Sequence, residues 1–257
     1  VAGTTQYRVR VIDGSSGCSQ PFSNITTVVV QNNATVSITV NNAEVCIDGT
    51  ALLTATVTGG SSGLTLQWQS SPNNSTWSNV PGATSSTYNA PTTVAGTTWY
   101  RVQVTDSQPL CADPASNSLS VLVRPDPTVS VSAQFAEICI GGSSLLTAVV
   151  AGGSSQQTLQ WQSNTGSSWV NISGANSTTY NVQGTVAGTT LYRILLLDPN
   201  SGCPATLAST DLSILVQPDA AVTASPLSNE VCVGGTALVT ATVTGGSTQL
   251  TYQWQSS

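Results

Sequence analysis

The amino-acid sequence predicts an all-β protein built from tandem antiparallel β-sandwiches. The first observation is an internal repeat of about 93 residues, because Cys46, Cys139 and Cys232 are each 93 residues apart. The second is the alternation of apolar and polar residues, which places one side of a strand on a core and the other in water. The third is the recurrence of turn residues at about 8–12 residue spacing, which is typical of a sandwich.

The repeat divides the chain into four parts. Residues 32–124 and 125–217 are complete repeats, residues 1–31 match the last two strands (F and G), and residues 218–257 match the first three (A to C). We expect a segment of a longer repeat protein. The alternative is a separate subunit whose terminal half-domains are completed by neighbouring copies. The linkers are short and contain proline, which indicates stiffness.

Seven strands are predicted in the first complete repeat, and the second repeat copies them. In residues 53–57 (LTATV) and 100–104 (YRVQV), apolar and polar residues alternate, as expected for half-buried antiparallel strands. Glycine, proline and asparagine separate the strands. The predicted strands are residues 35–40, 50–57, 64–70, 76–80, 86–90, 99–105 and 117–123.

A tryptophan recurs on the third strand and a tyrosine on the sixth. These are large side chains at inward positions of the alternation, so we expect them to fill the core of each sandwich. The predicted core residues are Trp68, Trp161, Trp254, Tyr100 and Tyr192.

This arrangement of cysteine, tryptophan and tyrosine resembles the immunoglobulin-like sandwich. More narrowly, the whole chain resembles the tandem Ig-like and PKD-like repeats of giant cell-surface adhesins of Bacteroidota, including gliding-motility adhesins of the SprB type. The matching motifs are V-C-x-G-G-T, T-G-G-S, Q-W, V-A-G-T-T-x-Y-R-V and a V-T-D run that leads to Cys111. The resemblance implies a bacterial, extracellular, cell-surface protein that serves as a spacer or a binder.

The composition argues against enzymatic chemistry. Only 6% of the residues are charged, all five basic residues are arginines, and histidine is absent. Histidine is the usual general base and the commonest metal ligand. We therefore expect no catalytic residues, no cofactor and no metal site, and we expect no nucleic-acid partner because no basic patch is present.

Aspartates recur at turns. Asp13, Asp106 and Asp198 end the sixth strand of successive repeats, and Asp48 follows Cys46. Turn formation is the favoured interpretation of these residues. Calcium binding, which requires six to eight oxygen ligands, is the weaker alternative.

Surface aromatic residues raise the possibility of sugar stacking. Trp77 and Trp169 recur at one repeat position, which favours a packing role, whereas other residue types replace Trp99 in the sister repeats. Sugar binding at Trp99 is therefore the less favoured hypothesis. The arginines that follow the sixth-strand tyrosine are expected to point outward, and they are Arg8, Arg101 and Arg193.

Six cysteines in a chain of this composition indicate an oxidising, extracellular compartment. Each repeat has one cysteine before the second strand and one after the sixth, and these positions lie at opposite poles of a sandwich. A strand of about eight residues separates the poles by roughly 25 Å, whereas a disulfide needs Cα atoms within about 7 Å. The disulfide candidates are Cys18, Cys46, Cys111, Cys139, Cys203 and Cys232.

Two pairing schemes follow from these positions. Pairs within a repeat, Cys46 with Cys111 and Cys139 with Cys203, require a departure from immunoglobulin topology. A pair between consecutive repeats, Cys46 with Cys203, fits that topology better and leaves the other four cysteines to pair outside this chain. Both schemes stay open on the sequence alone, and free thiols or inter-chain bonds are the least favoured alternative.

The sequence therefore predicts a non-enzymatic structural protein, a row of Ig-like domains in a cell-surface filament or adhesin stalk. Its expected partners are neighbouring copies or repeats of the same protein, and no membrane insertion is expected within this segment. The alternative function is a module that binds glycans or host surfaces, as an accessory to a secreted enzyme, with surface glycans as its partners.

Overall fold

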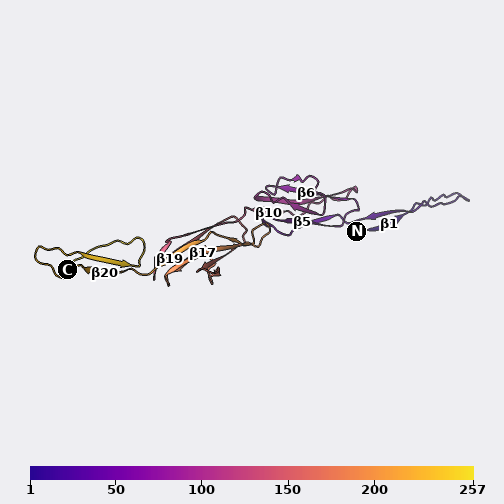
Figure 1. Cartoon of the computed structure of the whole chain (residues 1–257). Coiled ribbons are helices and arrows are strands. Elements are labelled where there is room, and N and C mark those ends of the chain that lie inside the picture. The colour runs from indigo at the N-terminus through magenta and orange to yellow at the C-terminus, as the bar shows by residue number, and fades with distance from the viewer. The chain divides into compact units, whose positions relative to one another are not determined.

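The computed structural model describes residues 1–257, which form strands and turns but no helix. This confirms the all-β prediction. The chain divides into two compact units, Val1–Pro125 and Asp126–Ser257. In Figure 1, β5, β6 and β10 belong to the first complete repeat, and β17 and β19 belong to the second.

The first complete repeat is a sandwich of two sheets. One sheet has the strand order β3-β5-β8, and the other has the order β4-β10-β9-β6-β7. The three-stranded sheet contains β3 (Thr35–Val40), β5 (Ala51–Thr58) and β8 (Thr87–Ala90). The five-stranded sheet contains β4 (Glu44–Cys46), β10 (Leu119–Arg124), β9 (Gly96–Asp106), β6 (Leu64–Ser71) and β7 (Ser78–Asn79).

All seven predicted strands of this repeat are present, but the sequence missed an eighth. The short strand β4 pairs in parallel with the end of β10, so that Cys46 lies opposite Arg124. Three residues are too few to show an apolar alternation. Cys46 therefore belongs to the five-stranded sheet and not to the loop before β5.

The second complete repeat has the same two-sheet architecture. Its sheets have the orders β11-β13-β16 and β12-β19-β17-β14-β15, with β18 paired to β17. This is the strand arrangement of an immunoglobulin-like sandwich. The strands are β11 (Thr128–Ala133), β12 (Glu137–Cys139), β13 (Ser143–Ala151), β14 (Thr158–Asn164), β15 (Val170–Asn171), β16 (Thr179–Gln183), β17 (Gly188–Leu197), β18 (Leu207–Ala208) and β19 (Leu212–Gln217).

Aromatic side chains occupy the centre of both sandwiches. Trp68 is 0% exposed, and its indole nitrogen donates a hydrogen bond of 2.9 Å to the Ser85 carbonyl. The Tyr88 ring lies between Trp68 and Tyr100, with centroids 5.8 Å from each. Burial, together with the nearby Tyr88, raises the pKa of Tyr100 to about 12, so this hydroxyl stays neutral at physiological pH.

The second repeat reproduces this core. Trp161 is 0% exposed and Tyr192 is buried, with Tyr180 lying between the two rings. The indole nitrogen of Trp161 donates to the Ser177 carbonyl at 2.9 Å. Both tryptophans thus have a buried ring whose polar atom is satisfied.

The terminal parts form two-stranded sheets. β1 (Gly3–Tyr7) pairs with β2 (Thr26–Val30), and β20 (Ala221–Pro226) pairs with β21 (Val239–Thr244). Trp254 is 57% exposed and lies outside any strand, which differs from its predicted place in a core. In the complete repeats the strand that carries the equivalent tryptophan, β6 or β14, pairs with β9 or β17, and residues 218–257 contain no equivalent of β9 or β17.

Candidate functional site

A cluster of one arginine, one tryptophan and two amides lies on the outer face of the five-stranded sheet. Arg101 on β9 follows the buried Tyr100, so strand alternation turns its side chain outward. Its Nε donates to Gln69 Oε1 at 2.7 Å, and Gln69 Nε2 donates to Asn79 Oδ1 at 2.9 Å. The guanidinium carbon lies 4.4 Å from the centroid of the Trp77 ring, within the range of a cation–π contact. We call these four residues the arginine cluster.

The second repeat contains the same arginine cluster. Arg193 Nε donates to Gln162 Oε1 at 2.8 Å, and Gln162 Nε2 donates to Asn171 Oδ1 at 2.8 Å. The guanidinium lies 4.2 Å from the centroid of the Trp169 ring. In both repeats, therefore, the residues that a ligand would use for stacking and hydrogen bonding already bind one another.

Replacing Arg193 with lysine should lower the free energy of unfolding of the second repeat by about 0.5–1 kcal/mol, because the cation–π contact loses its planar guanidinium. Chemical denaturation of the whole chain measures this change. The equivalent Arg101→Lys variant should behave alike in the first repeat. A variant as stable as the wild type would show that the cluster does not stabilise the sheet.

Two aspartates hold the loop between β5 and β6 in the first repeat and the loop between β13 and β14 in the second. In the second repeat, Asp198 is 1% exposed and accepts hydrogen bonds of 2.6 Å from the Ser154 amide and the Ser154 hydroxyl. It also accepts one of 3.2 Å from the Asn200 amide. In the first repeat, Asp106 accepts from the Ser61 amide and hydroxyl. These carboxylates therefore act in turns, as the sequence predicts.

The same contacts lower the pKa of both carboxyl groups. Hydrogen bonds from the Ser61 hydroxyl and amide hold the pKa of Asp106 below its ordinary value. Burial acts to raise the pKa of Asp198, but hydrogen bonds from Ser154 and Asn200 outweigh it, so this pKa is also lowered. The charged form of each aspartate is thus the form that the fold stabilises.

We expect acid to destabilise the chain through these aspartates. Their stabilisation is complete above the ordinary aspartate pKa of about 3.9 and is lost as the pH falls through their lower folded-state pKa values. The midpoint of thermal unfolding should fall steeply only below about pH 4. In an Asp198→Asn variant, the unfolding midpoint should fall less steeply with acid. In a Ser154→Ala variant, the fall should begin at a higher pH. An acid transition unchanged in both variants would contradict this assignment.

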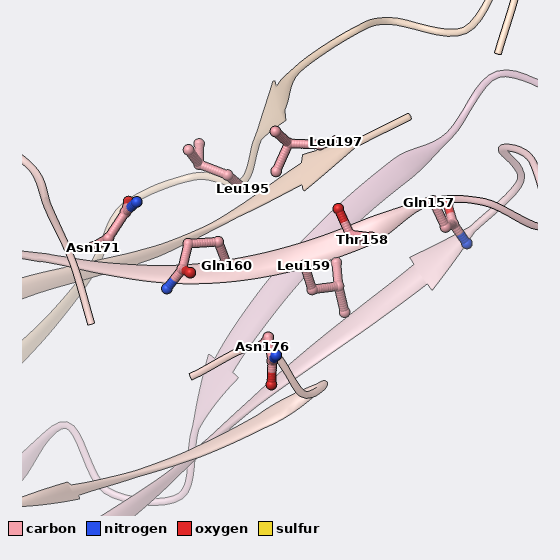
Figure 2. A pocket seen from close by; sticks show the side chains of 8 residues that line it. All are labelled: Gln157, Thr158, Leu159, Gln160, Asn171, Asn176, Leu195 and Leu197. Carbon is pink, nitrogen blue, oxygen red and sulfur yellow. The ribbon is translucent and has the colours of Figure 1, made fainter. Parts of the chain in front are cut away.

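A shallow hollow with a volume of about 570 Å³ lies beside β14 and β17. Figure 2 shows Leu195 and Leu197 on one side of the β14 ribbon, and Leu159 and Asn176 on the other. No side chain in its lining carries a charge, and glutamine and threonine replace the two β17 leucines in the first repeat. The hollow is lined by Gln157, Thr158, Leu159, Gln160, Asn171, Asn176, Leu195 and Leu197.

A glutamate at the start of the short parallel strand makes a third kind of contact. Glu137 on β12 accepts a hydrogen bond of 3.0 Å from Gln217 Nε2 and one of 2.9 Å from the Thr248 hydroxyl. Thr248 belongs to the partial repeat that follows, within the same compact unit. In the first repeat, Arg124 Nε lies 2.7 Å from Glu44 Oε1 in an ion pair.

These glutamates are not among the residues that the sequence predicts for a site, although a signal was present. Glu44, Glu137 and Glu230 are the only glutamates among the 257 residues, and each stands two residues before a cysteine. A residue type confined to one repeat position indicates a shared role, and in both complete repeats this glutamate binds the last residue of the final strand, Arg124 or Gln217.

The cysteines differ in chemical state. Cys46 and Cys203 are disulfide-bonded. Free thiols are found at Cys18, Cys111, Cys139 and Cys232. The pairs within a repeat are therefore excluded, because each of them needs a cysteine that is free.

The chain contains no helix of the length and hydropathy that crossing a bilayer requires. No curated protein matches the sequence. Among similar solved structures, murine CEACAM1b is 15% identical, with 71% of this chain and 100% of that chain covered and a TM-score of 0.40. The three N-terminal domains of the outer capsid protein Hoc of bacteriophage RB49 are 16% identical, with 84% of this chain and 72% of that chain covered and a TM-score of 0.41. The ectodomain of mouse nectin-like molecule 4 is 17% identical, with 71% of this chain and 64% of that chain covered and a TM-score of 0.39.

Residues 35–125 and 128–218 each match the family model described as a domain of unknown function, DUF8696. These two matches cover both complete sandwiches and more than half of the 257 residues. The chain therefore belongs to the DUF8696 family and contains two of its domains in tandem.

Proposed function

We propose that the chain is a non-enzymatic extracellular structural protein, a row of Ig-like domains within a cell-surface filament or adhesin stalk. The resemblance of its repeats to bacterial adhesins of the SprB type supports this function. The observation that carries the proposal is the arginine cluster, which is present in both complete repeats and in which the arginine Nε, both amide atoms of the glutamine and the asparagine oxygen are hydrogen-bonded within the cluster. A binding site would instead leave its ring faces and amides available to a ligand.

The contact between Glu137 and Thr248 supports the same function. It joins a complete repeat to residues of the repeat that follows, so one repeat supports the next. A row of such contacts makes a length that scales with the number of repeats. The uncharged polar surface also suits an extracellular stalk, because salt and pH have few charges on which to act.

Binding of the whole chain to a glycan array tests this proposal. We expect no binding that depends on the surface tryptophans, so Trp99→Ala, Trp77→Ala and Trp169→Ala variants should give the same array signal as the wild type. Selective binding of one glycan class by the wild type, lost in any of these variants, would overturn the proposal. It would favour the glycan-binding module instead.

A further inference from the structure

The second complete repeat is attached at two points to the partial repeat formed by residues 218–257. One point is the chain itself, because β19 ends at Gln217 and β20 begins at Ala221, which leaves only a short linker. The other is Glu137 on β12, whose Oε2 accepts hydrogen bonds of 2.9 Å from the Thr248 hydroxyl and 3.5 Å from the Thr248 amide. All of these residues belong to the same compact unit. A body held at one point can pivot, whereas a second point of attachment restricts it.

The turn that makes this contact, residues 245–249, is packed against the linker. The amide of Gly246 donates a hydrogen bond of 2.8 Å to the Pro218 carbonyl. Gly245 has a φ of 72°, which is left-handed backbone that glycine adopts without strain. A Cβ at Gly245 would also collide with the Asp219 carbonyl, so only glycine allows this approach. The turn is thus fixed to the linker, and its hydroxyl is presented to β12.

Both oxygens of the Glu137 carboxylate face hydrogen-bond donors. Oε1 accepts from Gln217 Nε2 at 3.0 Å, and Oε2 accepts from Thr248. Hydrogen bonds to a charged acceptor are roughly twice as strong as those between neutral groups. A proton added to either oxygen removes the charge and places a hydrogen against a donor. The contact with Thr248 therefore depends on the charged form of Glu137.

No opposite charge holds this carboxylate in its charged form. β19 and the turn, which are the two elements that donate to Glu137, contain no charged residue. The titratable groups on the adjoining segments are the thiol of Cys139 on β12 and the carboxyl of Asp219 in the linker. In the first repeat, by contrast, Arg124 forms an ion pair with the equivalent Glu44. Glu137 is thus the more readily protonated of the two glutamates.

We propose that Glu137 locks the joint between the second complete repeat and the partial repeat that follows, and that one added proton unlocks it. With the carboxylate charged, the linker and the Glu137–Thr248 contact together fix the orientation of residues 218–257. With the carboxyl neutral, only the linker remains, and the partial repeat pivots on it. The proposal deepens the stalk function and rests on it for the use of a joint whose stiffness changes with pH.

The form of Glu137 that the contact stabilises sets the direction of the pH response. Hydrogen bonds from Gln217 and then from Thr248 hold its pKa below the ordinary glutamate value. The contact is therefore complete above the ordinary pKa of about 4.3 and is lost as the pH falls through the lower folded-state pKa. The joint is locked at neutral pH and unlocks in acid.

NMR of the whole chain tests the joint through residual dipolar couplings, which report the orientation of backbone amides. One alignment tensor should fit the amides of β13, β17, β20 and β21 in the wild type at neutral pH. In Thr248→Val, which loses the hydroxyl, and in Glu137→Gln, which loses the charge, β20 and β21 should require a separate and smaller tensor at the same pH. Thr248→Ser keeps the hydroxyl and should keep the single tensor.

Acid should reproduce the effect of these variants in the wild type, and the tensor change should have the same midpoint as an NMR titration of the Glu137 carboxyl. Gln217→Arg introduces the charged partner of the first repeat, so both midpoints should fall by about one pH unit. Glu137→Gln is expected to unlock at neutral pH, where Asp198 stays charged, which separates unlocking from acid unfolding of the sandwich. Unchanged amide shifts in β13 and β17 check that the sandwich is intact.

A single tensor for Thr248→Val or Glu137→Gln would overturn the proposal, and so would separate tensors for the wild type or Thr248→Ser at neutral pH. A tensor change in acid that does not follow the Glu137 titration, or midpoints that Gln217→Arg leaves in place, would show that the charge of Glu137 does not control the joint. These outcomes concern the joint alone. The stalk function fails on a different result, the selective glycan binding described above.

Discussion

Replacing Trp68 with alanine should lower the free energy of unfolding of the first complete repeat by about 3–5 kcal/mol. The indole is fully buried in the centre of the sandwich, between the two sheets and against Tyr88. Its removal leaves a cavity and deprives the Ser85 carbonyl of its hydrogen-bond donor. Urea denaturation followed by far-ultraviolet circular dichroism measures the loss.

The repeat provides a matched control for this substitution. Trp254 occupies the position equivalent to Trp68 but is 57% exposed, so Trp254→Ala should change stability by less than about 0.5 kcal/mol. Trp161→Ala in the second repeat should match Trp68→Ala. Equal and small effects in all three variants would show that the tryptophan position does not hold the core together.

Replacing Cys203 with serine should lower the free energy of unfolding by up to about 5 kcal/mol. Cys203 is disulfide-bonded, and a disulfide restricts the unfolded chain more than the folded one. Thermal unfolding of oxidised and reduced protein measures this effect. Reductant should lower the unfolding midpoint of the wild type but not that of Cys203→Ser.

Cys139→Ser is the control for the disulfide. Cys139 occupies the repeat position of Cys46 but is a free thiol, so its replacement should leave the effect of reductant unchanged. If reductant had the same small effect on wild type, Cys139→Ser and Cys203→Ser, no disulfide would stabilise this chain.

Much of the fold could be predicted because its strands obey a local rule. The alternation around Leu53 and Tyr100 is a property of five consecutive residues, and the repeat presents it more than once. β4 could not be found in this way. It has three residues, and it forms because β10, more than 70 residues away in sequence, offers a free edge for parallel pairing.

The contacts of the candidate site were harder to predict than its residues. Alternation predicts that Arg101 points outward, but its contacts with Gln69 and Trp77 depend on which strands are neighbours. Likewise, the sequence identifies Asp198 as a turn residue without revealing that Ser154, in a different loop, is its partner. Such pairs are determined by tertiary structure and have no local pattern.

The positions of the cysteines in the fold could be predicted, but their oxidation states could not. Placing Cys46 and Cys111 at opposite poles required only the strand order and the length of a strand. Those two facts disfavoured the pairs within a repeat, and the free thiols of Cys111 and Cys139 exclude them. The sequence alone left the choice open because it does not contain the oxidation state of a sulfur atom.

Stretching single molecules from their two ends, with reductant present, tests most directly whether these repeats act as a force-carrying row of sandwiches. Each of the two complete repeats should unfold in one step that releases roughly 250 Å, because about 90 residues become free to extend. Smooth extension without two such steps would contradict a row of independently folded sandwiches.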